Sequence, residues 1–427
     1  MIRRLIAAAV LPLVVAGLAL SGPVSPTAAA APCSVQIVAH EDDDLLFMNP
    51  DIQRDVRADR CVRTVYLTAG DAGRDIGYWS ARETGEKTAY ATMAGRPNTW
   101  SDAVISVPGR DVRVSRLAGT RVELVFLRLP DGFDGRGSDR YGAQSLQKLW
   151  EGHLGRLTTV DGAQSYSRAE LIGVLHGLLA EAGADIVRLQ DFRGDSGPIG
   201  VNGGDGDHHD HHVAAYFANA ARRLLATPHQ TNTYRGYSIS DLPANVTGAD
   251  LDLKKATFYA YAAHDELLGC KDDRTCDADP TDGGRPSVYR PWLERQYQLP
   301  GPAADGSVEL RALSIRCLDV RDFDTSNGAA VQLWDCAGSP NQQWTFTADG
   351  ALRGFAGKCL DADPAGPAVR IWDCGGAAHQ RWTLTGEGEL RDPAGRCLDL
   401  RDADLPNGTP AEMRPCTGEP RQKWRAV

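Results

Sequence analysis

Three copies of one short pattern constrain the fold of the C-terminal third of this 427-residue chain. Each copy has a Cys-Leu-Asp triplet, then a second cysteine, and a Gln-x-Trp triplet that ends eight residues after it. The copies lie about 40 residues apart, with first cysteines at Cys317, Cys359 and Cys397 and tryptophans at Trp344, Trp382 and Trp424. Three copies cannot close a propeller but do make a β-trefoil, so residues 307–427 are predicted to be an all-β domain with the tryptophans mainly in its core.

The N-terminal part alternates strand-like and helix-like segments. Helical patterns lie at 81–93 and 168–182, and apolar strand-like runs lie at 34–39, 62–68, 122–129 and 184–189. This alternation is typical of an α/β fold with a mostly parallel sheet and helices on both faces. Ligands of such sheets gather at the carboxyl ends of the strands. We therefore expect the functional site at that edge, where His40, Asp71, Asp131 and Asp191 follow the predicted strands.

Two patches rich in histidine and carboxylate groups predict a metal site. The run from His40 to Asp44 follows the first strand, and the run from Asp207 to His212 opens an apolar helix-like segment at 213–225. An acidic run alone is usually a solvated turn, but here it is joined to a second patch at the same predicted edge. Two imidazoles and one carboxylate, with a position left for water, are typical of catalytic zinc. The sequence therefore predicts one mononuclear centre.

The ordered motifs of residues 31–297 resemble those of the PIG-L/LmbE-type deacetylases. They are Ala39-His40-Glu41-Asp42-Asp43, Thr68-Ala69-Gly70-Asp71, Arg82-Glu83, Leu129-Pro130-Asp131-Gly132 and His208-His209-Asp210-His211. The resemblance implies that His40, Asp43 and His211 bind one Zn²⁺ per chain. It also implies that Asp42 is the general base and that His208 stabilises the oxyanion or protonates the leaving amine.

Two positions depart from the family pattern, and several others have two interpretations. Glu41 stands where the family usually has proline, and Asp44 where it has glutamate, while the three ligand positions are unaltered. Candidate contacts to substrate hydroxyls, which helix and loop salt bridges would explain equally well, are Asp71, Arg82 and Asp131. Three further histidines are expected outside the metal site. His209 and His212 are expected to be exposed side chains or neighbours of the ligands. His264 could line the pocket, but a core or capping role is favoured.

Ten cysteines allow five disulfides in an oxidising compartment. Two neighbouring parallel strands would bring Cys33 level with Cys61, and Cys270 with Cys276 would close a small loop. Spacing pairs the remaining six within the three repeats, Cys317 with Cys336, Cys359 with Cys374 and Cys397 with Cys416.

The first 30 residues have the layout of a secretory signal peptide. Arg3 and Arg4 precede an apolar run from Leu5 to Leu20, and Ala28 to Ala30 follow. No other stretch could span a membrane, so we expect a secreted, extracellular protein with no membrane partner after cleavage. Removal of these two positive charges changes the net charge from −10 to −12, which argues against nucleic acid as a partner. Residues 298–306 break all periodicity and are predicted to be a linker.

The C-terminal segment, residues 307–427, resembles the ricin B-type lectin family. A sugar site of that family combines carboxylate and amide groups for hydroxyls with an aromatic face for the ring. Copy one matches a galactose-type site at every position, through Asp319, Gln332, Trp334, Asn341 and Gln342. Copy two keeps Asp361, Trp372 and Gln380 but has Arg370 and His379 at the other two positions, and is a possible second site. Copy three has Glu412 and Arg414 in place of the amide and the tryptophan, which predicts a structural lobe.

The two resemblances together favour one function. It is a secreted zinc-dependent hydrolase that removes N-acyl groups, most simply N-acetyl, from an amino sugar or glycan and is held near glycans by the lectin domain. Two alternatives stay open. One is a glycan-binding protein with a weakly active or inactive deacetylase-like domain, and the other is an amide hydrolase acting on a non-sugar metabolite.

Overall fold

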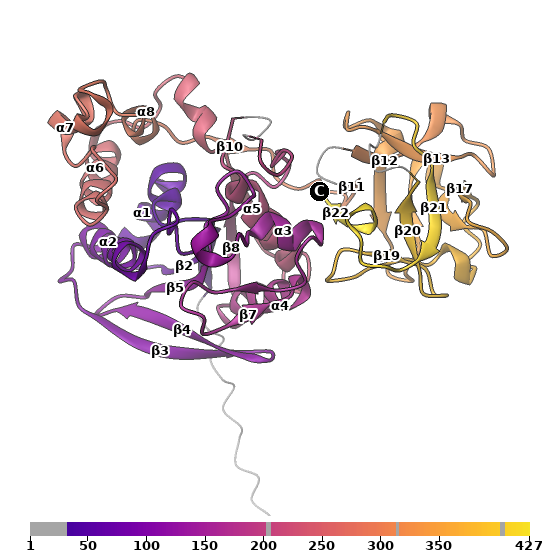
Figure 1. Cartoon of the computed structure of the whole chain (residues 1–427), viewed down its shortest axis with the longest axis horizontal. Helices are drawn as coiled ribbons and strands as arrows, with labels where there is room; N and C mark the ends of the chain where they lie inside the picture. Colours follow the sequence, from indigo (N-terminus) through magenta and orange to yellow (C-terminus); the bar gives the residue numbers. More distant parts are fainter. Residues whose placement is uncertain (1–31, 202–205, 313–315, 402–405) are drawn as a thin grey trace, which may run out of the picture. The chain divides into compact units, whose positions relative to one another are not determined.

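The computed structural model describes residues 32–201, 206–312, 316–401 and 406–427, so the predicted signal peptide, residues 1–30, lies outside the described residues. Eight strands form one sheet in the N-terminal domain, in the order β10-β9-β8-β1-β2-β5-β4-β3 (Figure 1). Pairing is parallel from β9 to β5 and antiparallel at both edges. The strands are β1 (Cys33–Val38), β2 (Cys61–Thr68), β3 (Trp100–Val107), β4 (Arg110–Leu117), β5 (Val122–Leu129), β8 (Ala184–Leu189), β9 (Gln230–Tyr234) and β10 (Gln298–Leu299).

Helices cover both faces of this sheet, as predicted. Side chains of β1 alternate, so Ile37 packs with α4 (Arg168–Glu181) and α5 (His209–Arg222) in one hydrophobic cluster, whereas Val38 packs with α2 (Ile76–Ala94) and α6 (Gly248–Ala262) in the other. The domain is completed by α1 (Asp51–Arg57), α3 (Leu146–Glu151), α7 (Asp273–Asp277), α8 (Tyr289–Leu293) and the short pair β6 (Leu157–Thr158) and β7 (Ser165–Tyr166).

The strand register brings Cys33 opposite Cys61, as the sequence predicts for two level parallel strands. Their disulfide lies at the start of β1 and β2, at the edge of the sheet opposite to the motifs that follow these strands. The other four predicted disulfides are also present.

The antiparallel hairpin of β3 and β4 was not expected. Its pattern is visible in the sequence, since Val112 and Val114 are buried while Asp111 and Arg113 are exposed, and a Pro-Gly turn precedes them. The hairpin adds an antiparallel edge to a sheet that is parallel at its centre. β10 covers the first two residues of the predicted linker and pairs with β9.

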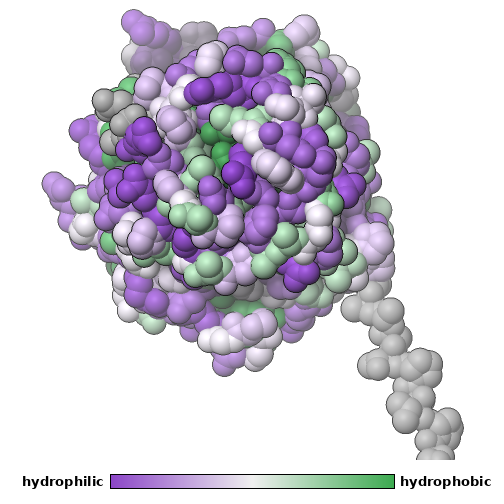
Figure 2. All heavy atoms as spheres, turned by 90° about the vertical axis from the view of Figure 1, so that its right-hand side faces the viewer, coloured by the Kyte–Doolittle hydropathy of each residue, from purple (hydrophilic) through white to green (hydrophobic). Residues whose placement is uncertain are grey.

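The C-terminal domain is all-β, as predicted. Its short strands surround one hydrophobic cluster, and the last strand pairs with the first. They are β11 (Val308–Ala312), β12 (Arg316–Val320), β13 (Val331–Asp335), β14 (Gln343–Phe346), β15 (Leu352–Arg353), β16 (Cys359–Ala362), β17 (Val369–Trp372), β18 (Thr383–Leu384), β19 (Leu390–Arg391), β20 (Arg396–Leu400), β21 (Ala411–Pro415) and β22 (Trp424–Ala426). The view onto this domain shows a mainly hydrophilic surface with scattered apolar patches (Figure 2).

The three repeat tryptophans are buried in that cluster and have the same bond in every copy. The indole Nε1 donates to the carbonyl oxygen of the leucine in the Cys-Leu-Asp triplet, over 2.9 Å from Trp344, 2.9 Å from Trp382 and 3.0 Å from Trp424. The repeated pattern therefore has a structural role in the core, because in each copy this bond joins the Gln-x-Trp triplet to the Cys-Leu-Asp triplet. None of the helices within the described residues is long and apolar enough to cross a membrane.

Candidate functional site: a histidine and carboxylate centre, with sugar sites in the trefoil

The turn after β1 brings three predicted site residues together. His40 N donates to Asp43 Oδ2 over 2.8 Å, which folds the turn back on itself. Asp42 between them has a φ of 98°, a conformation that side chains other than glycine rarely adopt, and its N–H donates to Glu86 Oε1 over 3.0 Å. Strained backbone of this kind persists where the surrounding structure fixes it, often at functional sites.

The N-terminus of α5 supplies the second half of the site. His208 caps this helix, because its Nδ1 accepts the N–H of Asp210 over 3.1 Å. His211, one turn into the helix, is fully buried and points its Nε2 at Asp43 Oδ1, 2.9 Å away. Asp43 Oδ2 lies 3.5 Å from His40 Nδ1. The structure therefore places Asp43 between the two histidines that were predicted as ligands with it.

The described residues fit a zinc site at this point. Nε2 of His40 and Nε2 of His211 are buried and make no hydrogen bond, which leaves two imidazole nitrogens without a protein donor or acceptor of good geometry. Ligand atoms of His40, His208 and His211 lie within 4.8 Å of one another, and so do those of His40, Asp131, His208 and Asp210. Imidazole and carboxylate donors in this number suit Zn²⁺. The second group overlaps the predicted trio only at His40.

Two carboxylates that sequence reasoning missed lie beside the histidines. Asp207 Oδ1 lies 2.7 Å from His211 Nδ1, and Asp210 Oδ2 lies 3.4 Å from His40 Nε2. Asp210 Oδ2 also accepts the N–H of Gly132 over 2.7 Å, and a Cβ on that glycine would come within 2.5 Å of Asp210 Oδ1. Asp207 lies behind the free Nε2 of His211, and a carboxylate in that position fixes the tautomer and the ring orientation of a metal-binding histidine. Asp210 instead faces Nε2 of His40, so it lies on the side of that ring where a metal would bind. Their position beside His208 and His211 in the sequence was the available signal.

Asp42 is surrounded by buried polar groups. Arg82 Nη2 donates to Asp42 Oδ1 over 3.2 Å, and Arg82 also donates to the carbonyls of Gly70, over 2.6 Å, and Glu41. Its Nε donates to Tyr261 Oη over 2.6 Å. Burial raises the pKa of Asp42 to about 7, and the Arg82 charge opposes that shift. Each of the three guanidinium nitrogens of Arg82 therefore already donates a hydrogen bond to a protein group.

Asp71 and Asp131, the other two predicted contacts to substrate, lie at different distances from the histidine centre. Asp71 is fully buried, and its two oxygens accept the N–H groups of Gly73 over 2.8 Å and Asp131 over 2.7 Å. Asp131 lies closer to the histidines, with Oδ1 4.0 Å from His40 Nε2 and 3.9 Å from His208 Nε2. The structure brings Asp131 to the histidine centre and places Asp71 beneath it.

The two departures from the family pattern are buried. Glu41 is fully enclosed, and burial raises its pKa to about 8, with Arg82 opposing the shift. Asp44 accepts a 2.6 Å hydrogen bond from Tyr90, and burial raises its pKa to about 7 although this bond opposes the shift. Both side chains are shielded from solvent, but they differ in their partners. Asp44 is held by Tyr90, whereas neither carboxylate oxygen of Glu41 has a hydrogen-bond partner among the described residues.

The three histidines that were predicted to lie outside the metal site are His209, His212 and His264. His209 and His212 are buried rather than exposed, and each is held by protein groups, His209 by Gln147 and Val201 and His212 by the carbonyl of Asp191. His264 lies 3.3 Å from Thr88 Oγ1. For His209 and His212, exposure was therefore the wrong one of the two predicted interpretations, and both are buried neighbours of the proposed ligands.

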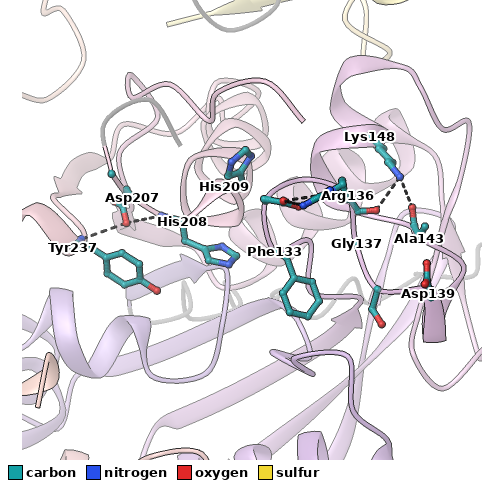
Figure 3. A pocket seen from close by; sticks show the side chains of 13 residues that line it. Phe133, Arg136, Gly137, Asp139, Ala143, Lys148, Asp207, His208, His209 and Tyr237 are labelled. Atoms are coloured by element: carbon teal, nitrogen blue, oxygen red, sulfur yellow. Dashed lines mark hydrogen bonds and ion pairs between the residues drawn. The ribbon is translucent and has the colours of Figure 1, made fainter. Parts of the chain in front are cut away.

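A pocket of about 1060 Å³ opens beside this centre. Figure 3 shows the rings of His208 and Phe133 pointing into the same opening, with Tyr237 beyond His208 and with Arg136, Asp139 and Lys148 along the far side. His208 therefore connects the buried histidines to a space large enough for a substrate.

Copy one of the trefoil assembles its predicted sugar-binding residues around Asp319. This carboxylate accepts hydrogen bonds from Gln332 (3.1 Å), Asn341 (2.8 Å) and Gln342 (3.0 Å). Gln342 also bonds to two backbone groups, one at Ala337 and one at Asp335, as its counterparts do in the other copies. Trp334 is 43% exposed, so its ring is available to a ligand.

Arginine side chains, and in copy two also a histidine, lie beside the corresponding carboxylates of copies two and three. Asp361 lies 3.2 Å from Arg370 Nε and 2.8 Å from His379 Nδ1, while Trp372 is 40% exposed. In copy three, Asp399 lies 3.1 Å from Arg421 Nε. Glu412 and Arg414, which replace the amide and the tryptophan of copy one, pair with each other over 2.8 Å. Only copy one combines an aromatic face with a carboxylate held by amides alone.

The relatives of this chain match its two domains separately. A family model described as GlcNAc-PI de-N-acetylase matches residues 35–222, and one described as ricin-type beta-trefoil lectin domain matches residues 304–424. The designed threefold-symmetric protein ThreeFoil is 32% identical, with 29% of this chain and 99% of that chain covered and a TM-score of 0.27.

Curated relatives are matched over short segments. Beta-galactoside-specific lectin 2 of Viscum album is 50% identical over 46 residues, which are 10% of this chain and 8% of that protein. Glucan endo-1,3-beta-glucosidase of Arthrobacter sp. (strain YCWD3) is 32% identical over 138 residues, 30% of this chain and 25% of that protein. The chain thus spans a quarter or less of the length of these relatives. By the two family matches, the chain carries a domain of the GlcNAc-PI de-N-acetylase (PIG-L) family followed by a ricin-type β-trefoil lectin domain.

Proposed function

We propose that the protein is a secreted, zinc-dependent N-deacetylase of an amino sugar or glycan, targeted by its lectin domain. The observation that carries the proposal is the buried contact of Asp43 with His211, 2.9 Å, and with His40, 3.5 Å, beside a large pocket. We assign the zinc to His40, Asp43 and His211. The five disulfides support folding in an oxidising compartment outside the cytoplasm.

The residues around this site suit amide hydrolysis. Zinc in the site would polarise the amide carbonyl and lower the pKa of the attacking water. Asp42, the next carboxylate in the same turn, accepts the proton of that water as general base. His208 then stabilises the oxyanion through a hydrogen bond from Nε2, or, in its protonated form, gives a proton to the leaving amine and returns to the neutral ring. In the first case the proton that Asp42 took from water passes to the leaving amine.

The hydrogen bonds around the two α5 histidines favour these roles. Nδ1 of His208 accepts a backbone N–H, so the proton of the neutral ring resides on Nε2, on the side of Asp131 and the pocket. Nδ1 of His211 faces Asp207, which favours a proton there and leaves the lone pair of Nε2 for the metal. One helix turn therefore presents a hydrogen-bond donor for the oxyanion and a metal ligand, with different tautomers.

We further propose that Arg82 is a positioning residue for Asp42 and not a substrate contact. Replacing Arg82 by Gln should leave the zinc content unchanged and lower kcat about 10- to 100-fold, the usual cost of losing such a support. It should also move the acidic limb of the pH profile to higher pH, because Arg82 opposes the rise in the pKa of Asp42.

The matched control for this variant is Arg128→Gln, which breaks an ion pair with Glu83 on the same domain. It should leave the acidic limb where it is in the wild type. Arg82→Lys should recover part of the lost rate, since it keeps the charge. A raised KM with unchanged kcat in Arg82→Gln would show instead that Arg82 binds substrate.

In the trefoil, we propose that copy one binds galactose-type sugars through Asp319, Asn341 and the face of Trp334. Gln342 and Gln380 then act by holding their aspartates, since their own hydrogen-bonding groups are engaged in the lobe. Nδ2 of Asn341 is engaged as well, with Asp319 Oδ2 over 2.8 Å and with the carbonyl of Val320 over 2.9 Å, so a sugar hydroxyl would share or displace these bonds. Asp319→Ala in the full chain should remove most galactose binding measured by calorimetry. Asp399→Ala should change it little, because copy three has no aromatic face.

This binding should matter only for large substrates. Tethering raises the effective concentration of substrate around the active site, so Asp319→Ala should slow deacetylation of polymeric or surface-bound glycan. On a small soluble amino sugar its rate should equal that of wild type. Greater loss of galactose binding in Asp399→Ala than in Asp319→Ala would contradict the assignment of copies.

The experiment that tests the whole proposal is a deacetylation assay with zinc content measured on the same sample. Its substrates are N-acetylated amino sugars, N-acetylated glycans and acetamides without a sugar. Turnover of the sugars with one zinc per chain supports the proposal. A protein that binds glycans but holds no zinc and turns over none of these substrates would be a lectin with an inactive domain, and turnover of the non-sugar acetamides alone would indicate a metabolite hydrolase.

A further inference from the structure

Phe133 is an aromatic residue that the fold itself does not use. Its side chain is 37% exposed, and it belongs to none of the three hydrophobic clusters found among the described residues. Its φ of 55° lies in the left-handed region, where a phenylalanine is strained. Phe133 is therefore both exposed and strained, and such a side chain adds little to the stability of the fold. This combination indicates a role in binding a ligand.

The surrounding backbone holds this ring in place. Phe133 N donates to Asp131 Oδ1 over 2.8 Å, and Asp131 N in turn donates to Asp71 Oδ2 over 2.7 Å. A Cβ on Gly73 would lie 3.5 Å from Phe133 Cζ, so the tip of the ring rests near the loop after β2. The backbone of Phe133 is therefore tied to the same strand ends that carry the histidine centre, and the tip of its ring lies near Gly73.

The pocket around Phe133 combines this aromatic face with polar groups. Ser138, Asp139 and Lys148 line the pocket with it, and Figure 3 shows Asp139 and Lys148 on the side away from His208. Lys148 Nζ donates to the carbonyls of Arg136 and Ala143, which uses two of its three N–H groups. An acyl chain would need apolar walls, whereas an apolar ring face bordered by hydroxyl, carboxylate and ammonium groups suits a sugar ring.

The size of the pocket also bears on the substrate. Its volume of about 1060 Å³ slightly exceeds that of pockets that enclose a drug-sized ligand, about 300–1,000 Å³. One amino sugar with its acyl group is smaller than that. Because the amide must reach His208 and Asp42, the space beyond His208, along Phe133, is left for another part of the substrate.

We propose that Phe133 is the platform for a second pyranose ring, so that the deacetylase pocket takes an N-acylated amino sugar joined to at least one further sugar unit. The proposal rests on the proposed N-deacetylase function and specifies its substrate class. Phe133 acts on binding alone and takes no part in proton transfer. Specificity for the larger substrate then comes from the N-terminal domain itself, independently of the lectin sites.

The test compares an N-acetylated amino-sugar disaccharide with the corresponding monosaccharide. Wild type should have the higher kcat/KM on the disaccharide, and Phe133→Ala and Phe133→Leu should lose about 10-fold of that preference through KM, with zinc content unchanged. Phe133→Trp should keep it. Phe323→Ala is the matched control, since Phe323 is also exposed, 52%, and has a φ of 56°, but lies in the trefoil.

Binding to the Asp42→Asn, Asp319→Ala double variant, measured by calorimetry, separates this proposal from the proposed function. If wild type turned over neither sugar, the deacetylase proposal would fail, yet tighter binding of the disaccharide that depends on Phe133 would still support the platform. An unchanged preference in both the Ala and Leu variants would overturn it. So would a loss that follows the length of the acyl chain and not the number of sugar rings.

Discussion

The Asp42→Asn variant should retain one zinc ion per chain while its turnover falls on the order of 10²–10⁴-fold, the usual contribution of a general base. Asparagine keeps the shape of the side chain and can still contact Arg82, 3.2 Å away in the wild type, but it cannot accept the proton of water. The backbone bond from Asp42 N to Glu86 is unaffected by the change. Zinc content by metal analysis and kcat on an N-acetylated amino sugar, from the same preparation, measure the two effects.

Asp134→Asn is the matched control for this variant. Asp134 lines the same pocket but pairs with Arg136, away from the histidine centre. Its variant should keep both zinc and rate within a few-fold of wild type. Activity of Asp42→Asn at that same level would show that another group is the base, and loss of its zinc would show that Asp42 is a ligand.

The His40→Ala variant should lose zinc and activity together. His40 is buried against Asp43, and its removal leaves a buried carboxylate with one histidine fewer around it. Two of the three assigned donors then remain, which is fewer than catalytic zinc sites use. Metal analysis after dialysis, followed by the deacetylation assay, gives the result.

His264→Ala serves as the control for His40→Ala, because His264 is a histidine of the same domain that lies beside Thr88. It should keep its zinc. A His40→Ala protein with full zinc occupancy would move the metal to other donors, and the group of Asp131, His208 and Asp210 is the nearest such set. Thermal unfolding of both variants shows whether the domain remains folded.

Much of the fold follows from the sequence because its central strands are short, apolar and regularly spaced. β5 and β8 begin and end at the predicted residues, and the level pairing of Cys33 with Cys61 follows from two parallel strands of known ends. The three disulfides of the trefoil follow in the same way, since the repeat fixes which cysteines belong to one lobe. The β3 and β4 hairpin was missed because its half-buried alternation resembles an exposed connection when no partner strand is known.

The spacing of the motifs could not predict which polar side chains already have hydrogen-bond partners within the protein. Arg82 and Asp71 have the residue types that bind hydroxyls, but only the structure shows their hydrogen-bonding groups directed at backbone and protein side chains. Tyr261, which contacts Arg82, lies on α6, far beyond the motifs in sequence. The contacts of Asp207 and Asp210 with the histidines depend on the cap of α5, which a motif does not specify.

The bond from each tryptophan to the leucine carbonyl of its own copy has a consequence for how the lectin domain can change. The scaffold of a lobe depends on its tryptophan, leucine, glutamine and aspartate, and all three lobes have these four residues. Trp334, which we propose contacts a sugar, and its counterpart Arg414 in copy three are exposed and are not among these four residues. Under the proposed assignment, the valency of the domain can therefore change one lobe at a time. A substitution at the position of Trp334 or Arg414 alters the ligand face of one lobe and leaves the four scaffold residues of every lobe in place.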